Sequence, residues 1–258
     1  MRKTALVTGA SSGIGYDLAG LFAQGGFDLV LTARNRAALD ALAQKCQSEH
    51  GAQAEVLAAD LADPACPQRI FDELSARSIS VAILVNNAGL GTHGLFAEAD
   101  WPSQLQMLQV NLVAATHLTS LFLPEMRKRG SGRILNVASM AGFMPGPYMS
   151  VYYATKAFML SHSVALAEEL RGTGVTVTAL CPGPTRTDFQ RRAGIDESRL
   201  FQTSPMDSIS VARAGYRGLM EGKTIIIPGL SNKLVGLASR ALSRSRMARI
   251  AGNLNRNR

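Results

Sequence analysis

The sequence of 258 residues is poor in cysteine and in aromatic residues, and it has no long apolar run. Its three cysteines, Cys46, Cys66 and Cys181, cannot all pair, and their spacing matches neither a zinc motif nor a Cys-x-x-Cys motif. We therefore expect a reduced, cytoplasmic setting and no bound metal. No stretch approaches the ~18 consecutive apolar residues of a transmembrane helix, so a membrane-spanning protein is not expected.

Acidic residues are missing from the C-terminal end. Residues 233–258 contain seven Lys and Arg and no Asp or Glu, whereas the rest of the chain has 20 basic and 19 acidic residues. The tail therefore contributes +7 of the net charge of +8, and the rest of the chain only +1. Apolar residues recur there at roughly helical spacing, which predicts a basic C-terminal helical tail over residues 231–258.

Three partners of this tail stay open: the body of the protein, an anionic membrane and nucleic acid. The tail has no aromatic residue that could stack on bases, so a nucleic-acid partner is not expected. We favour a helix that caps a pocket or forms a dimer seam slightly over one that lies on a membrane surface.

Apolar residues make up 47% of the chain, which suffices for a packed core and excludes intrinsic disorder. Continuous apolar runs, typical of strands covered on both faces, alternate with helical patterns. Strands are predicted at 4–8, 29–33, 55–59, 81–86, 133–137, 176–180 and 224–227, and helices at 14–25, 36–49, 66–77, 101–129, 153–171 and 208–221. The pattern predicts an α/β fold of the Rossmann type, a doubly wound parallel sheet of about seven strands with helices on both faces. No linker divides it, so residues 1–230 are expected to form a single domain.

A glycine-rich segment follows the first predicted strand at the point where a helical pattern begins. Its glycines permit a tight turn, a close approach of a diphosphate and close helix packing, while the helix N-terminus attracts the anion. The interpretation as a plain Gly/Ser turn is weaker because the segment stands at the first strand-to-helix junction. The residues expected to bind the cofactor here are Gly9, Ser11, Ser12, Gly13, Ile14 and Gly15.

The end of the second predicted strand bears on the choice between NAD and NADP. A carboxylate there would bind the ribose hydroxyl of NAD, but the sequence has Ala33 followed by Arg34, and Asp28 lies at the opposite end of the strand. An Arg can meet a 2′-phosphate with two hydrogen bonds. We therefore predict NADP(H), although Arg34 and Arg36 could also be solvated residues at a helix start.

A tyrosine and a lysine four residues apart are the best candidates for chemistry. Tyr152 and Lys156 share one face of a predicted helix, and Tyr with an ordinary pKa of ~10 needs a neighbouring cation to exchange protons near neutral pH. Tyr153 has no such lysine. Ser139 follows the fifth predicted strand and could hydrogen-bond the same carbonyl oxygen.

Together with the glycine-rich segment and Asn87-Ala88-Gly89, these residues resemble the short-chain dehydrogenase/reductase family over residues 4 to about 188. The resemblance implies that Tyr152 is the proton donor, that Lys156 lowers its pKa and holds the nicotinamide ribose, and that Ser139 orients the carbonyl. It further implies that Asn111 holds a water linked to Lys156 and that Asp60 binds adenine, although Asp60 could instead cap the helix that follows. Further cofactor contacts are implied for Leu61, Asn87, Ala88, Gly89, Pro182, Gly183, Thr185 and Thr187.

The segments expected to surround the substrate are largely apolar. They contribute Phe96, Phe143, Met144, Tyr148 and Phe189, which suits a hydrophobic carbonyl substrate better than a sugar. Residues 182–189 are similar to those of family members that reduce 3-oxoacyl and keto-steroid substrates. The basic residues Arg186, Arg191, Arg192 and Arg199 are interpreted as a solvated face rather than as a site for an acyl carrier.

The sequence thus predicts an NADPH-dependent reductase of a small-molecule carbonyl, or a dehydrogenase that oxidises the corresponding alcohol by the reverse hydride transfer. Residues 1–230 would then be its single dinucleotide-binding and catalytic domain. The alternative is a dinucleotide-binding regulatory or scaffold protein, associated with a membrane surface through its basic tail. The predicted helices at 101–129 and 153–171 are apolar over more than one face, which indicates a homodimer or homotetramer.

Overall fold

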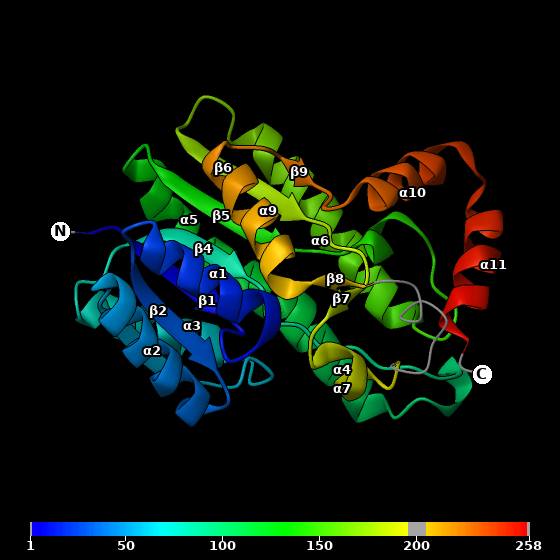
Figure 1. Ribbon diagram of the computed structural model, residues 1–258, viewed down its shortest axis with the longest axis horizontal. Helices are drawn as coiled ribbons and strands as arrows, with labels where there is room; N and C mark the ends of the chain where they lie inside the picture. Colours follow the sequence, from blue (N-terminus) through cyan, green and yellow to red (C-terminus); the bar gives the residue numbers. More distant parts are fainter. Residues whose placement is uncertain (1, 196–204, 257–258) are drawn as a thin grey trace.

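A computed structural model describes residues 2–195 and 205–256. Seven parallel strands form its central sheet in the order β3-β2-β1-β4-β5-β6-β9 (Figure 1). The strands are β1 (Thr4–Thr8), β2 (Asp28–Ala33), β3 (Ala54–Ala58), β4 (Val81–Asn86), β5 (Gly132–Val137), β6 (Val175–Leu180) and β9 (Ile225–Ile226). The order reverses beside β1, so the turns after β1 and β4 diverge and leave a crevice at the carboxyl edge of the sheet.

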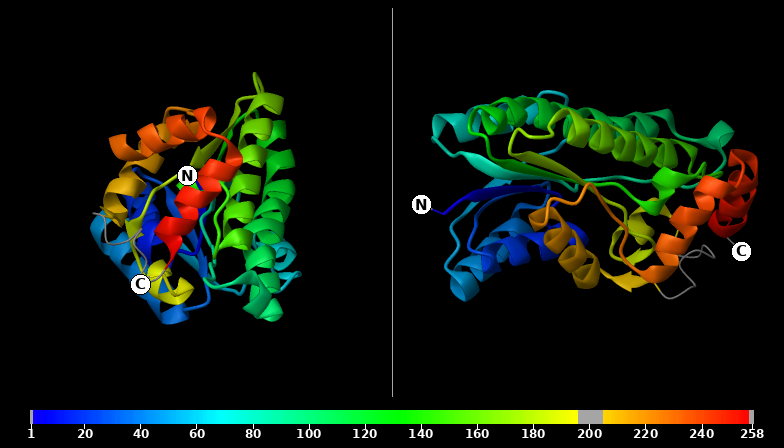
Figure 2. Two further views of the ribbon diagram at one scale, coloured as in Figure 1. Left: turned by 90° about the vertical axis from the view of Figure 1, so that its right-hand side faces the viewer. Right: turned by 90° about the horizontal axis from the view of Figure 1, so that it is seen from above.

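Helices cover both faces of this sheet, as the view along it in Figure 2 shows. The helices α1 (Gly13–Gln24), α2 (Arg36–His50) and α9 (Ser208–Met220) pack together on one face, where Leu18, Phe22 and Leu219 are fully buried. The helices α3 (Cys66–Ala76), α5 (Ala115–Lys128) and α6 (Ser150–Glu169) lie on the other. The predicted doubly wound Rossmann-type fold is confirmed.

Local sequence signals set several helix ends. The side chain of Asn35 accepts a hydrogen bond from the backbone N–H of Ala38 and so caps the start of α2. Gly51 ends α2 in the left-handed conformation, with φ 64°, which glycine adopts without strain. Because α2 begins directly after β2, Arg34 is left at the carboxyl edge of the sheet.

The helix predicted over residues 101–129 is continuous but changes its winding. It consists of α4 (Trp101–Leu108), a π-helical turn η2 (Gln109–Ala114) and α5. By length and composition the stretch from Trp101 to Lys128 could cross a membrane, but its residues Leu118, Phe122 and Met126 are buried against the sheet. It serves as a core helix of the fold.

Two segments outside the sheet close over its carboxyl edge. The first contains β7 (Thr185–Arg186), α7 (Phe189–Ala193) and β8 (Met206–Asp207), and Arg199 lies outside the described residues. The second is the roof, which we define as α10 (Leu230–Ala241) and α11 (Arg244–Asn255) (Figures 1 and 2). Short 3-10 turns, η1 (Phe96–Glu98) and η3 (Met140–Phe143), complete this end.

Candidate active site

A cavity of about 670 Å³ runs along the carboxyl edge of the sheet. Its floor comes from the turns that follow β1, β2, β4, β5 and β6, and α7 and the roof close it from above. Residues that are far apart in the sequence therefore meet around a single hollow.

The glycine-rich turn after β1 forms one end of the cavity. Gly9 has a φ of 65°, and a Cβ atom added to it would lie 2.9 Å from Cα of Ala88, so a side chain would be both strained and obstructed. Ser12 precedes α1, but its side chain makes no capping hydrogen bond. The first N–H groups of α1 are therefore available to an anion at the cavity end.

Asn87 fastens this turn to the end of β4. Its side-chain Nδ2 donates to the backbone oxygens of Thr8, at 2.9 Å, and Gly9, at 3.2 Å. Its backbone N–H and that of Ala88 both donate to Oγ1 of Thr8. Asn87, Ala88 and Gly89 line the cavity, and their hydrogen bonds hold the shape of its floor.

Two basic residues after β2 differ in their surroundings. Arg34 is exposed and lines the cavity, and in the described part of the chain it has no carboxylate partner. Arg36 points along α2 and pairs with Asp40, with 3.7 Å between Nε and Oδ2. Only Arg34 is therefore available to a ligand in the cavity.

Asp60 and Leu61, after β3, also line the cavity. The carboxylate of Asp60 accepts a hydrogen bond from the backbone N–H of Ala62 at 3.0 Å, while α3 begins at Cys66 with Ala65 at its cap position. The interpretation of Asp60 as a helix cap is therefore wrong, because the chain makes a turn between this residue and the helix.

Ser139, Tyr152 and Lys156 share one wall of the cavity. Lys156 is buried, its Nζ donates to the backbone oxygen of Val137 at 2.8 Å, and it lies 5.7 Å from the ring centroid of Tyr152. The Ser139 side chain lies close enough to Tyr152 to act on the pKa of its phenol. The i, i+4 spacing on α6 brings the lysine and the tyrosine to the same face, as the sequence predicted.

Burial governs the protonation of this group. It raises the pKa of Tyr152, and the Ser139 side chain opposes that change. Burial lowers the pKa of Lys156 to about 8, since the charged ammonium loses its hydration. The tyrosine is therefore held in its protonated form, and the lysine titrates close to neutral pH.

Asn111 lies behind this wall, in the π-helical turn η2. Its Oδ1 accepts from the backbone N–H of Leu90 at 2.8 Å, and its Nδ2 donates to the oxygen of Leu90 and to Oγ1 of Thr155. A Cβ atom added to Gly89 would lie 3.5 Å from both Oδ1 of Asn111 and Nζ of Lys156. The two side chains thus flank the glycine, although Asn111 does not itself line the cavity.

The segment after β6 completes the floor. Pro182, Gly183, Thr185 and Thr187 all line the cavity. A Cβ atom added to Gly13 would lie 2.8 Å from Cγ2 of Thr187, so this threonine packs on the glycine-rich turn. Gly15 lies behind the turn, where an added Cβ atom would be 2.5 Å from the backbone oxygen of Gly9.

Three of the five expected substrate contacts lie elsewhere. Met144 and Phe189 line the cavity, with the Phe189 ring 5.3 Å from that of Tyr152. Phe96 is 62% exposed, and Phe143 packs on the core beside Met159. Tyr148 stacks on His93 and accepts hydrogen bonds from Arg256 at its hydroxyl. These expectations are corrected, because the side-chain directions of these loop residues follow from tertiary contacts that the sequence pattern does not reveal.

The roof supplies cavity residues that the list of expected contacts lacked. Val235 comes from α10, and Met247, Ile250 and Leu254 come from α11. The amphipathic spacing of the tail signalled a docked helix, but it gave no indication of the surface on which it docks.

The buried side chain of Asn255 locks the end of the roof. Its Oδ1 accepts from the hydroxyl of Tyr153 at 3.0 Å, and its Nδ2 donates to the oxygen of Pro147 at 3.0 Å. Its backbone oxygen lies 2.8 Å from Nε2 of His93. Both tyrosines line the cavity, but the Tyr153 hydroxyl is engaged with the roof, whereas Tyr152 lies beside Ser139.

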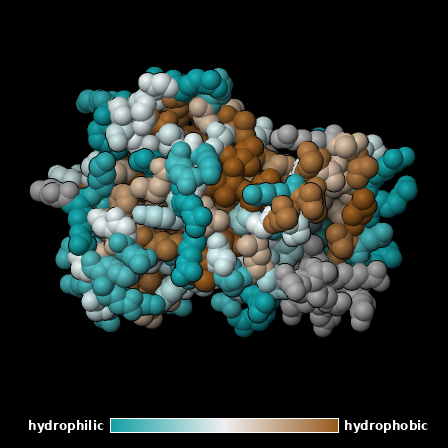
Figure 3. Space-filling view, turned by 45° about the horizontal axis from the view of Figure 1, so that its top comes forward, coloured by the Kyte–Doolittle hydropathy of each residue, from teal (hydrophilic) through white to brown (hydrophobic). Residues whose placement is uncertain are grey.

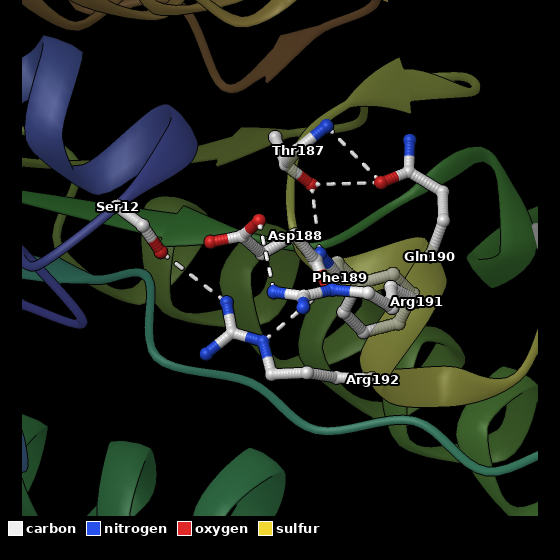
Figure 4. Close-up of polar contacts among 7 residues, drawn as sticks. All are labelled: Ser12, Thr187, Asp188, Phe189, Gln190, Arg191 and Arg192. Atoms are coloured by element: carbon white, nitrogen blue, oxygen red, sulfur yellow. Dashed lines mark hydrogen bonds and ion pairs between the residues drawn. The ribbon is translucent and has the colours of Figure 1, made fainter.

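Arg192 is a further residue whose place the sequence did not reveal. Figure 4 shows its guanidinium reaching from α7 towards the glycine-rich turn, where Nη2 donates to Oγ of Ser12 at 3.2 Å. Its neighbour Arg191 pairs with Asp188, at 3.5 Å, and does not line the cavity. The interpretation of Arg192 as part of a solvated face is corrected, because it is exposed yet directed at the cavity end.

The fold and this cavity define an α/β protein of the dinucleotide-binding class, and comparison with known proteins identifies its family. The family model described as short chain dehydrogenase matches residues 3–198. The chain is 36% identical to the ketoacyl reductase HetN of Nostoc sp. over 218 residues, covering 80% of this chain and 75% of that protein. It is also 36% identical to sulfoacetaldehyde reductase 2 of Chromohalobacter salexigens, covering 82% and 86%.

Solved structures agree with these relatives. A short-chain dehydrogenase from Sphingobium yanoikuyae in complex with NADPH superposes with a TM-score of 0.84 and 36% identity, and 93% of each chain is covered. The bulky-bulky ketone specific alcohol dehydrogenase from Comamonas testosteroni gives a TM-score of 0.79 and 32% identity, with 93% and 92% covered. The chain belongs to the short-chain dehydrogenase/reductase family, and it is an oxidoreductase acting on CH–OH or C=O groups.

Proposed function

We propose that the protein is an NADPH-dependent reductase of hydrophobic ketones or related carbonyl compounds, with Tyr152 as its acid. The observation that carries this proposal is the meeting of Ser139, Tyr152 and Lys156 on one wall of a cavity that continues to the glycine-rich turn and Arg34. A scaffold or regulatory protein would need a nucleotide site but no such group, so this alternative has weaker support.

The residues at the cavity end fit a dinucleotide phosphate. The N-terminus of α1 offers backbone N–H groups, Gly9 has no side chain to obstruct the approach, and Arg192 adds a cation. Arg34, with uncharged Ala33 before it, supports a preference for the 2′-phosphate of NADP, in keeping with the NADPH complex of the Sphingobium relative. When bound, this cofactor would supply the hydride.

The protein's own groups would then manage the carbonyl oxygen. Tyr152 would donate its proton to that oxygen as negative charge develops, and Ser139 would donate a hydrogen bond to the same atom. Lys156, when charged, would favour the tyrosinate that remains. Asn111, by fixing Leu90 and Thr155, would hold the floor beneath Lys156.

The substrate class follows from the walls of the cavity. Met144, Met149 and Phe189 line the cavity and pack in one apolar cluster with Tyr152, and the roof adds Ile250 and Leu254. Apolar and flexible methionine-rich walls suit bulky hydrophobic substrates. The names of the relatives, a ketoacyl reductase and a bulky-ketone alcohol dehydrogenase, support 3-oxoacyl, steroid and other bulky ketones as the compounds to test.

The test is NADPH oxidation across a panel of bulky ketones, 3-oxoacyl thioesters and keto-steroids. With a responsive substrate, Tyr152→Phe should lower kcat by at least about a thousandfold, within the range that acid catalysis by a positioned group supplies. NADPH binding should persist. The matched control is Tyr153→Phe, which loses only the hydrogen bond to Asn255 and should keep kcat near that of the wild type. Equal activity of the two variants would overturn the assignment of the acid.

Three further expectations are part of the proposal. The division into one domain of residues 1–230 and an appended tail of residues 231–258 is supported by the order of the elements. A reduced cytoplasmic location is supported by three cysteines that are free and buried. A homodimer or homotetramer is supported by exposed apolar side chains along η2 and α6, namely Val113, Phe158 and Val164.

A further inference from the structure

The outer face of α10 is apolar and exposed. Leu230, Leu234 and Leu237, spaced four and three residues apart, are 74%, 61% and 64% exposed. The opposite face of the same helix carries Asn232 and Val235 to the cavity. Figure 3 shows apolar side chains gathered over this part of the molecule. The inner face of α10 therefore has a place in the cavity wall. The three leucines on its outer face contribute to neither the core nor the cavity.

The charged side chains of the roof itself all have one sign. Lys233 on α10 and Arg244, Arg246 and Arg249 on α11 are exposed, and none of them pairs with a carboxylate among the described residues. The last acidic residue before them is Glu221, so residues 222–258 contain no Asp or Glu. The roof is thus a pair of short helices with an apolar ridge and unneutralised basic side chains.

The positive charge of the roof discriminates between the possible partners that could cover the three leucines. A second copy of the chain would bring the same basic face opposite itself, because a twofold interface uses one patch on both subunits, and the like charges would repel. Nucleic acid would match the charge but leave the leucines in water, and the roof has no aromatic residue to stack on bases. A bilayer with anionic headgroups matches both the apolar ridge and the charge.

We propose that α10 and α11 dock the protein on an anionic membrane surface, with Leu230, Leu234 and Leu237 at the level of the headgroups and acyl chains. Ile250 and Leu254 lie at the edge of the same roof, where they line the cavity and remain 45% and 37% exposed. If the proposed reduction of hydrophobic carbonyl compounds holds, a docked roof would place the cavity beside the phase in which such substrates dissolve. The docking itself does not depend on that reaction.

The test is co-sedimentation of the full chain with vesicles, without cofactor or substrate. Wild-type protein should bind vesicles of phosphatidylcholine mixed with phosphatidylglycerol, and it should bind vesicles of phosphatidylcholine alone at least tenfold more weakly. The double variant Leu234→Gln/Leu237→Gln should weaken binding at least tenfold. In a series of Arg244→Ala, Arg246→Ala and Arg249→Ala, each removed charge should weaken binding about fivefold.

The control is Trp101→Gln/Leu105→Gln, which removes two exposed apolar side chains from α4, away from the roof and from the expected oligomer contact, and should leave vesicle binding unchanged. Melting temperature and NADPH affinity establish that all variants fold. Unchanged binding by the leucine variant, equal binding to both vesicle types or no binding by the wild type would each overturn the proposal. Light scattering that shows self-association lost in the leucine variant would instead assign the face to a second copy.

Discussion

Arg34 and Arg36 follow strand β2 two residues apart, yet only Arg34 faces the cavity, because Arg36 pairs with Asp40. Arg34→Ala should weaken NADPH binding by about tenfold to a few hundredfold, the value of about 1.5–3 kcal/mol for hydrogen bonds to a charged phosphate. NADH binding should hardly change. Adding Ala33→Asp should reverse the preference, since a carboxylate repels the phosphate and accepts hydrogen bonds from a free ribose.

Calorimetric titration of both cofactors measures these affinities. Arg36→Ala is the matched control, and it should bind NADPH as the wild type does. A wild type with equal affinity for NADH and NADPH would contradict the assignment of Arg34.

Lys156 should set the alkaline limit of carbonyl reduction. Its pKa of about 8 lies below the ordinary 10.5, so the free enzyme loses this charge as the pH rises through about 8. Tyr152 stays protonated in that range, because burial raises its pKa. The value of kcat/KM for reduction, which reports the free enzyme, should therefore fall above about pH 8.

The variant Lys156→Arg tests whether Lys156 causes this fall in kcat/KM. Arginine remains charged throughout the range, so whatever activity the variant retains should lose the fall near pH 8. If kcat/KM of the variant still falls near pH 8, the titrating group is not Lys156.

The residues that could be predicted are those whose position follows from the chain itself. Ser139, Tyr152 and Lys156 meet because a strand end and one helical turn bring them together, and the geometry needs little beyond local rules. Phe96, Phe143 and Tyr148 could not be placed, because their directions depend on the tertiary surroundings. Phe96 is left exposed, Phe143 packs on the core, and Tyr148 turns towards Arg256, 108 residues away. Arg192 was missed for the same reason, since its partner Ser12 is 180 residues away.

At the level of elements, the docking of α11 on the rest of the protein depends on the side chain of Asn255. Asn255→Ala would leave the buried Tyr153 hydroxyl without its partner and would also remove the hydrogen bond to the Pro147 oxygen. We expect the free energy of unfolding to fall by about 1–3 kcal/mol, the cost of leaving buried polar groups unsatisfied. Hydrogen exchange should accelerate in α11 before it changes in the sheet.

Calorimetry and hydrogen exchange by mass spectrometry measure the two effects. Asn253→Ala is a suitable control, because Asn253 lies on the same helix and is exposed. Equal destabilisation by both substitutions would show that Asn255 has no special part in holding the roof.

The seven strands of the sheet were predictable within one residue at every end, because continuous apolar runs are diagnostic of strands covered on both faces. The π-helical turn Gln109–Ala114 could not be predicted, because one extra residue in a helical turn leaves the spacing of apolar residues almost intact. The two-residue strands β7 and β8 also escaped, because a pair so short has no periodicity to detect.

At the scale of the whole molecule, the exposed apolar residues of η2 and α6 predict that the protein is an oligomer in solution. Light scattering should give a multiple of the chain mass of 27.5 kDa. Phe158→Lys together with Val164→Lys should shift the protein towards the monomer, because charges opposed across a symmetric contact repel. A wild type that is monomeric at high concentration would contradict this assignment.

The doubly wound topology was predictable because alternation of strands and helices, with right-handed crossovers, leaves few arrangements. The alternation does not predict the position of α10 and α11. These two helices follow the final strand, so no strand–helix–strand crossover determines where they pack. Their position had to come from the contacts themselves, above all from those of Asn255.

Those contacts also order events during synthesis. The bonds of Asn255 reach back 102 residues to Tyr153 and 162 residues to the ring of His93, whereas the nucleotide end of the cavity is built around turns that leave the ribosome much earlier. At ~5–20 residues per second, the sheet and its glycine-rich turn can be in place for seconds before α11 emerges. A nascent chain can therefore form the glycine-rich end of its cavity while the apolar hollow is still uncovered. During that interval a cofactor, or a chaperone that covers apolar surface, can reach the crevice from the side that the finished protein closes.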